Sequence, residues 1–148
     1  MLEYHLHTAF GYRVSRMARG IERRFEIALG RYDLTRLTWC LLSAIGHEKL
    51  RRPSDVADYI GVARPIVSRS LRAMEQKKLV ARTSSEKDKR YVEIVLTEEG
   101  QSLLETITPL AQSVAEHFTS KLSAEELAVF QTCIDSLSDK EADDLPSI

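Results

Sequence analysis

The sequence is poor in the features that mark disulfide scaffolds, membrane proteins and enzymes. It has two cysteines and no Cys-x-x-Cys pair, so a disulfide framework is excluded and a reducing compartment is favoured. No apolar run approaches the length of a membrane span, and the N-terminus lacks the apolar stretch of a signal peptide. A glycine-rich phosphate loop, a His-Glu-x-x-His motif and a nucleophile elbow are also absent. We therefore expect a cytoplasmic protein that is not an enzyme and needs no cofactor and no membrane.

The histidines and cysteines leave two minor alternatives open. His5 and His7 lie close together, and His117 follows an acidic residue, so each group is a conceivable set of metal ligands, although solvated histidines are more common. Cys40 lies in an apolar segment and Cys133 lies on or beside an apolar stripe. A free cysteine is commonly a small buried hydrophobe. We expect no metal site, and we keep a cysteine redox sensor as an alternative.

Positive charge is concentrated in one part of the chain. The formal net charge is only −1, which by itself argues against a nucleic-acid partner. Counted along the sequence, however, residues 1–48 carry +2, residues 49–90 carry +7 and residues 91–148 carry −10. Binding to nucleic acid depends on the local density of basic side chains, because those side chains neutralise phosphates. The middle segment is therefore where we expect such a partner.

Within the basic segment, the pattern predicts a helix-turn-helix. Residues 53–60 favour a short helix, in which Pro53 suits the first helical position and after which Gly61 ends the helix. A second helix is predicted from Arg64 to about Lys78, because apolar residues recur on one side at helical spacing. In a helix-turn-helix the second helix enters the major groove of DNA. The sequence therefore predicts a recognition helix here.

The opposite side of that second helix carries polar and basic residues. They are Arg64, Pro65, Ser68, Arg69, Arg72 and Gln76. Arginine donates paired hydrogen bonds to guanine or phosphate, and serine contacts either partner. The alternative for this helix alone is a solvated basic face without a ligand.

A predicted hairpin follows the recognition helix. Residues 79–83 and 91–96 favour strands, because β-branched and alternating apolar residues fill them. The polar link between them contains Lys87, Asp88 and Arg90. A basic hairpin at this place is typical of a wing, whose arginine enters a narrow minor groove while Asp88 braces Arg90. The alternative is a solvated loop with an incidental ion pair.

Long amphipathic helices are predicted on both sides of this unit. The first runs from about Glu3 to Leu29, and another begins after Thr97 and contains Pro109, which should bend it. Ser123 begins a capping box for the last helix. One small winged unit has too little surface to cover all these apolar stripes, so a second copy of the chain is the expected partner. The alternative is a monomeric bundle in which the stripes cover one another.

These motifs together resemble the MarR-type bacterial transcriptional regulators. The stretch 88–97, Asp-Lys-Arg-Tyr-Val-Glu-Ile-Val-Leu-Thr, followed by Glu-Glu-Gly, is similar to the family's wing and the start of its next helix. Leu34 and Thr35 with Trp39 resemble its second helix, and residues 60–62 resemble its turn. Two positions depart from the pattern, since Ala63 stands where a capping serine is common and Arg72 where an acidic residue is common.

The resemblance and the residues imply the same fold. We expect a mainly α protein with a small β-hairpin, forming one domain over residues 1–148. Residues 33–97 would form a winged helix-turn-helix that binds DNA. Residues 1–32 and 98–148 would form a helical dimerisation region.

The predicted function is a homodimeric, sequence-specific DNA-binding regulator, and the most favoured form is a repressor. Its operator would be pseudo-palindromic double-stranded DNA. The expected DNA-binding residues are Arg64, Pro65, Ser68, Arg69, Arg72, Lys87, Asp88 and Arg90. The resemblance also implies a small aromatic or anionic effector, for which Tyr12, Arg16 and Trp39 are candidate wall residues. The alternative from another class is a winged-helix protein-interaction module without DNA sequence specificity, which would need an exposed apolar anchor on the arginine face.

Overall fold

The computed structural model describes residues 5–84 and 92–139. Over these residues the chain is mainly helical with one two-stranded antiparallel sheet, which confirms the predicted class. The elements in chain order are η1 (Leu6–Thr8), α1 (Phe10–Gly30), α2 (Arg36–Gly46), α3 (Pro53–Ile60), α4 (Arg64–Gln76), β1 (Val80–Ser84), β2 (Val92–Leu96), α5 (Glu98–Thr119) and α6 (Ala124–Ser138).

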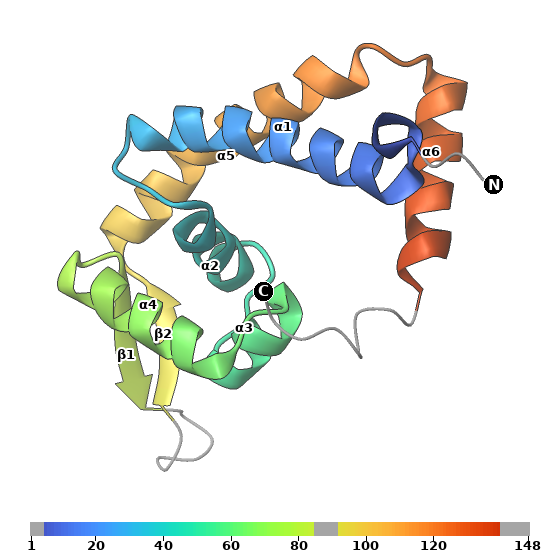
Figure 1. Ribbon diagram of the computed structural model, residues 1–148. Helices are drawn as coiled ribbons and strands as arrows, with labels where there is room; N and C mark the ends of the chain where they lie inside the picture. Colours follow the sequence, from blue (N-terminus) through green and yellow to red (C-terminus); the bar gives the residue numbers. More distant parts are fainter. Residues whose placement is uncertain (1–4, 85–91, 140–148) are drawn as a thin grey trace.

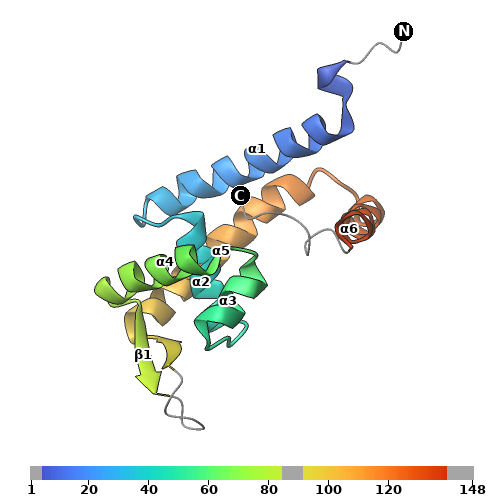
Figure 2. The same ribbon diagram turned by 60° about the horizontal axis from the view of Figure 1, so that its bottom comes forward.

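The elements form a compact unit and a set of longer helices that extends from it. Helices α2, α3 and α4 pack together with the hairpin at one end of the molecule, as Figures 1 and 2 both show. Helix α5 begins beside the hairpin, packs on α2 and then on α1. Helix α6 lies at the far end of α5, away from the hairpin (Figure 1). None of the described helices is both long and apolar enough to cross a membrane.

The core of the winged unit comes from the apolar faces of the four helices α2 to α5 and from both strands. On α4 the buried stripe is Val67, Leu71 and Met74, spaced three and four residues apart. This stripe packs with fully buried side chains of the neighbouring elements, which include Leu41, Leu42, Ile45, Val56, Ile94 and Leu104. On β2, Ile94 is fully buried, whereas Val92, on the same face two residues earlier, is exposed at the first position of the strand.

A second, smaller core joins α1 to the winged unit. Leu29 at the end of α1, Leu34 and Ile107 of α5 are buried together. The rings of Phe25 and Trp39 meet edge to face beside them, with centroids 5.8 Å apart. Trp39 is therefore a packing residue that helps to fix α1 against α2.

Hydroxyl side chains cap three of the described helices, and the one at Ser123 confirms the predicted capping box. The Thr35 hydroxyl accepts a hydrogen bond from the amide of Thr38 at 3.2 Å, and the Thr97 hydroxyl accepts one from the amide of Gly100 at 3.0 Å. Ser123 and Glu126 form the complete capping box. At α4 the cap residue Ala63 makes no side-chain hydrogen bond. The hydroxyls of Thr35, Thr97 and Ser123 each satisfy a backbone amide that has no hydrogen-bond partner within its helix.

Several predicted boundaries were wrong by a few residues. Helix α1 begins at Phe10, because the extended backbone of Ala9 separates it from the short turn η1. Helix α4 ends at Gln76, because Lys78 adopts a left-handed conformation with φ of 58° that an α-helix cannot contain. This reversal also starts β1 at Val80, one residue later than expected. The proline at 109 lies inside α5, which continues to Thr119.

Gly100 allows a close approach between the start of α5 and the backbone of Leu79. It is buried in the first turn of α5, and a Cβ atom added there would overlap the carbonyl oxygen of Leu79. The backbone of Thr97 donates to the same carbonyl at 3.1 Å. Absence of a side chain at Gly100 therefore lets α5 begin directly against the link between α4 and β1.

We predict that Gly100→Ala destabilises the fold by about 1–3 kcal/mol, since the added methyl forces α5 away from Leu79. Chemical unfolding followed by circular dichroism measures this change. The matched control is Gly20→Ala, where a Cβ meets no atom within 4 Å and stability should stay equal or rise by up to about 1 kcal/mol. Equal stability of the Gly100→Ala variant and the wild type would contradict the close approach.

Candidate nucleic-acid interface

The turn between α3 and α4 fixes the orientation of the candidate recognition helix. Gly61 ends α3 in the left-handed region with φ of 67°, a conformation that favours glycine. Helix α4 begins three residues later, at Arg64, and Pro65 lies in its first turn, where a missing amide hydrogen costs nothing. Since the stripe of α4 faces the core, its opposite side faces solvent. The geometry is that of a helix-turn-helix.

The outward side of α4 is polar, as the sequence predicted, with one difference. Arg64, Pro65, Arg69 and Arg72 are exposed, and Gln76 lies with them. Ser68 is half-buried, because it follows the buried Val67 by one residue and so lies on the flank of the helix. Among the described residues, Arg69 and Arg72 have neither an ion-pair partner nor a hydrogen-bond partner for their side chains. Their guanidinium groups are available to a ligand.

Arg64 is held by a residue that the sequence analysis did not single out. Its Nη2 atom donates to both carboxylate oxygens of Asp58, at 3.2 and 3.4 Å. Asp58 lies in the last turn of α3, six residues earlier. The available signal was an acidic side chain near the C-terminal end of a helix, a place where the helix dipole disfavours it.

Two more ion pairs hold the other end of α4. Arg82 of β1 pairs through Nε with Glu75 at 3.1 Å and so ties the hairpin to the last turn of α4. Lys77 pairs with Asp33 in the turn between α1 and α2 at 2.8 Å. Among the described basic residues from Arg64 to Lys77, therefore, Arg69 and Arg72 are the two without a counter-charge.

The ion pair of Asp33 depends on pH in a defined direction. A hydrogen bond from Lys77, and then the positive charge of Lys77, lower the pKa of the Asp33 carboxyl below its ordinary value. A lowered folded-state pKa means that the contact favours the folded state above the ordinary carboxyl range and is lost as pH falls through the lowered value. Asp33 itself has a left-handed backbone with φ of 53°. The turn is thus fastened to the end of α4 at neutral pH.

The hairpin has the predicted antiparallel pairing, but its tip lies outside the described residues. Val80 pairs with Leu96, and Ser84 pairs with Val92. The three expected contact residues of the wing, Lys87, Asp88 and Arg90, fall in residues 85–91, which the structure does not describe. The bracing of Arg90 by Asp88 therefore stays a prediction.

One arginine of the basic link before α3, residues 49–52, is used for packing. The side chain of Arg51 donates to the carbonyl of Ile45 at 3.4 Å, at the end of α2. Its own carbonyl accepts from the amide of Ile94 at 2.8 Å. Arg51 therefore fastens the link to α2 and β2.

One exposed apolar residue on α4 was not anticipated. Ile66 is 41% exposed, and it lines a cavity of about 400 Å³ together with Ile60, Val62 and Cys40. The cavity lies between the start of α2 and the turn before α4, so Ile66 belongs to the flank of α4 that faces α2. Burial raises the pKa of the Cys40 thiol, which lowers its reactive thiolate fraction.

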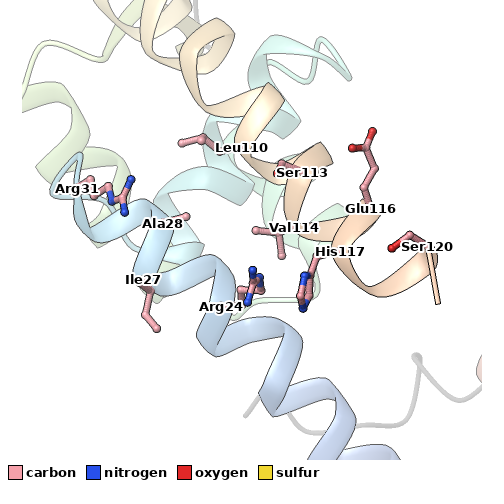
Figure 3. Close-up of a pocket in the computed structure, with 10 residues that line it drawn as sticks. All are labelled: Arg24, Ile27, Ala28, Arg31, Leu110, Ser113, Val114, Glu116, His117 and Ser120. Atoms are coloured by element: carbon pink, nitrogen blue, oxygen red, sulfur yellow. The ribbon is translucent and has the colours of Figure 1, made fainter.

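A larger cavity lies between α1 and α5 and is lined by basic and apolar groups. Its volume is about 660 Å³, and its lining residues are Arg24, Ile27, Ala28, Arg31, Leu110, Ser113, Val114, Glu116, His117 and Ser120. Figure 3 shows the Arg24 and His117 side chains between the two helices and Glu116 pointing away. Partial desolvation, and then the charges of Arg24 and Lys121, lower the pKa of His117. Neither Arg24 nor Arg31 has an ion-pair partner among the described residues.

The three suggested wall residues for an effector do not share one cavity. Tyr12 and Arg16 line a separate cavity of about 420 Å³ near the start of α1. Trp39 packs against Phe25 in the second core. In the described residues, no three histidine, cysteine or acidic side chains are grouped so that they could hold a metal ion.

Comparison with known proteins gives a consistent result. Residues 32–90 match the model of a family described as the MarR family. The transcriptional regulator HosA of Escherichia coli O157:H7 is 31% identical over 98 residues, which are 66% of this chain and 73% of that protein.

Two solved structures have the same fold. Staphylococcus aureus MepR, solved as a DNA complex, is 22% identical, with a TM-score of 0.81 over 90% of this chain and 96% of that chain. Bordetella bronchiseptica BpsR, whose DNA binding is regulated by 6-hydroxynicotinic acid, is 21% identical, with a TM-score of 0.83 over 94% of this chain and 99% of that chain.

Proposed function

Since this chain belongs to the MarR family of transcriptional regulators, we propose that it acts as a homodimeric repressor that a small anionic effector releases from DNA. In this proposal residues 33–97 bind DNA, and residues 1–32 and 98–148 form the dimer. The observation that carries it is the exposed basic face of α4, in which Arg69 and Arg72 lack a described counter-charge.

Recognition would occur through α4 in the major groove. The first residues of such a helix meet base edges, and arginine is the side chain best suited to guanine. Arg64, Pro65, Arg69 and Arg72 lie exposed on α4. Ser68, on the flank, is better placed for a phosphate than for a base. The wing residues Lys87, Asp88 and Arg90 are proposed to contact the adjacent minor groove.

Two uncovered apolar surfaces support the dimer. On η1 and the first half of α1, the exposed large apolar residues are Leu6, Phe10, Val14 and Met17. Helix α6, all of which is described, has no buried residue, and its stripe Phe130, Ile134 and Leu137 faces solvent. Contiguous exposed apolar surface of this kind marks an interaction site. This exposure also argues against the monomeric bundle in which the stripes cover one another.

A two-fold dimer would act on a two-fold operator. Its two recognition helices would lie about 34 Å apart, which matches half-sites separated by one helical turn of DNA. Because both half-sites must fit at once, a small change in the angle between the two winged units would lower affinity strongly.

The cavity between α1 and α5 is the site that we propose for the effector. Arg24 and Arg31 supply positive charge at its rim, while Ile27, Leu110 and Val114 supply apolar surface. This combination suits a small aromatic carboxylate. The regulation of the similar BpsR by 6-hydroxynicotinic acid supports the same chemical class. Since α1 carries part of the proposed dimer surface, and α1 and α5 both contact α2, a ligand between α1 and α5 would change the placement of the winged unit.

The first test is selection of bound sequences from random duplex DNA at fixed, near-physiological salt. We expect a palindromic motif with half-sites one helical turn apart. Arg69→Ala should then weaken the binding free energy for this motif by about 1–3 kcal/mol and relax the sequence preference at one base pair. Arg90→Ala should weaken binding mainly at A·T-rich flanks, where the minor groove is narrow.

Arg23→Ala, on α1, is the control that should leave DNA affinity unchanged. A uniform loss across sequences in the Arg69→Ala variant would mark a phosphate contact instead of a base contact. Failure to recover any motif, with only weak and steeply salt-dependent binding, would contradict the sequence-specific regulator and favour the protein-interaction module.

We predict that Ile134→Glu prevents dimer formation, because it places a charge in the apolar stripe of α6. Sedimentation equilibrium at micromolar concentration should give a monomer, with helix content unchanged by circular dichroism. Ser136→Glu, which places the same charge on the opposite side of α6, should remain dimeric. A wild-type protein that sediments as a monomer would contradict the dimer itself.

Effector release is tested with 6-hydroxynicotinic acid as the probe in an operator-binding titration. Millimolar probe should weaken the wild-type complex, and Arg24→Ala should remove this sensitivity without changing affinity in the absence of the probe. Arg23→Ala, which changes an adjacent arginine outside the cavity, should retain the sensitivity. Equal sensitivity of the Arg24 and Arg23 variants would exclude this cavity as the site.

A further inference from the structure

We propose that Asp58 is a positioning residue for DNA recognition: it holds the guanidinium of Arg64 at the start of α4 and so makes binding more selective among sequences. This inference rests on the proposed DNA-binding function. It assigns a role to a residue on α3 that makes no contact with the core. Its basis is the contact between Asp58 and Arg64 across the turn of the helix-turn-helix.

The geometry restricts Arg64 more than one hydrogen bond would. A single nitrogen, Nη2, contacts both carboxylate oxygens, at 3.2 and 3.4 Å. Nε and Nη1 have no described partner and keep their donors for a second ligand. Guanidinium has five donors in a fixed plane. Asp58 can therefore hold one edge of the group while another edge contacts DNA.

The contact contributes little to stability. The side chains of Arg64 and Asp58 are 68% and 64% exposed, and exposed ion pairs are strongly screened. In addition, a carboxylate near the C-terminal end of a helix is disfavoured by the helix dipole. Because Asp58 stabilises the fold so weakly, its presence at this position is better explained by its effect on the orientation of the Arg64 guanidinium.

Specificity is a difference between two affinities. An unrestrained arginine at the start of α4 binds any nearby phosphate, and this contact raises affinity for every sequence. Asp58 opposes such binding, because its own charge repels phosphates and because it competes for Nη2. A guanine whose O6 and N7 meet the remaining donors compensates for this cost. Other bases do not compensate for the cost of competing with Asp58. Asp58 therefore lowers the affinity for non-operator DNA more than the affinity for the operator.

The test compares binding to the recovered operator, to its single-base-pair variants and to a non-operator duplex, at fixed salt. The proteins are the wild type, Asp58→Asn, Arg64→Ala and the double variant. We expect Asp58→Asn to raise non-operator affinity several-fold and to reduce preference at one base pair by about fivefold or more, the lower end of one base contact. Its thermal unfolding temperature should stay close to that of the wild type.

The double variant separates positioning from direct contact. If Asp58 acts through Arg64, Asp58→Asn has no further effect on base preference once Arg64 is alanine. An effect that persists in the Arg64→Ala background would overturn the proposal, because Asp58 would then contact DNA itself.

Asp55→Asn is the matched control, since Asp55 lies on the same helix, is exposed and contacts Ser54 rather than an arginine. Equal effects of the Asp55 and Asp58 variants would reduce the role of Asp58 to general repulsion and would overturn the proposal. If the wild type recovers an operator and Asp58→Asn leaves the base preference unchanged, only this inference is wrong. A wild-type protein that recovers no operator defeats the proposed function and this inference with it.

Discussion

The exposed basic face of α4 depends on the burial of three side chains on its other face. Val67, Leu71 and Met74 are almost completely buried against α2, α3 and the hairpin. Full burial of such a side chain favours folding by about 1.5–3 kcal/mol, far more than the exposed ion pairs around α4 contribute. The apolar stripe therefore fixes the rotation of α4 about its axis, and this rotation directs the arginines on the opposite side toward solvent.

The same core also fixes where α5 begins. Gly100 touches the carbonyl of Leu79, and Gly46 of α2 leaves space that Leu96 and Leu104 fill. A side chain at Gly100 would meet the backbone of Leu79 and push α5 away, whereas a side chain at Gly46 would displace the ends of Leu96 and Leu104. Because the first turn of α5 is fastened to the hairpin in this way, the winged unit must follow when α5 tilts. The effector that we propose between α1 and α5 would thus act on α4 without touching it, by changing that tilt.

Periodicity and capping patterns in the sequence were sufficient to predict the elements and the outward side of α4. The caps at Thr35, Thr97 and Ser123 are local, so the residues that form them lie within one turn of each other. The left-handed Lys78 and the inward Arg51 depend on contacts that form only after folding. The contact of Arg64 with Asp58 crosses a turn, and helical spacing carries no information about such a contact. Sequence analysis therefore predicted which arginines are exposed but not which of them are paired.

This distinction changes how the charge of α4 should be understood. By sequence, four basic residues from Arg64 to Lys77 look equivalent. In the structure, Asp58 holds the first and Asp33 holds the last, while Arg69 and Arg72 between them have no described counter-charge. Paired arginines bind phosphate less strongly, because their charge is already compensated. In the proposed function, the attraction of α4 for DNA is therefore concentrated on Arg69 and Arg72. A helix with its unpaired charge at two adjacent turns would favour one position on DNA, whereas evenly spread charge would bind any nucleic acid.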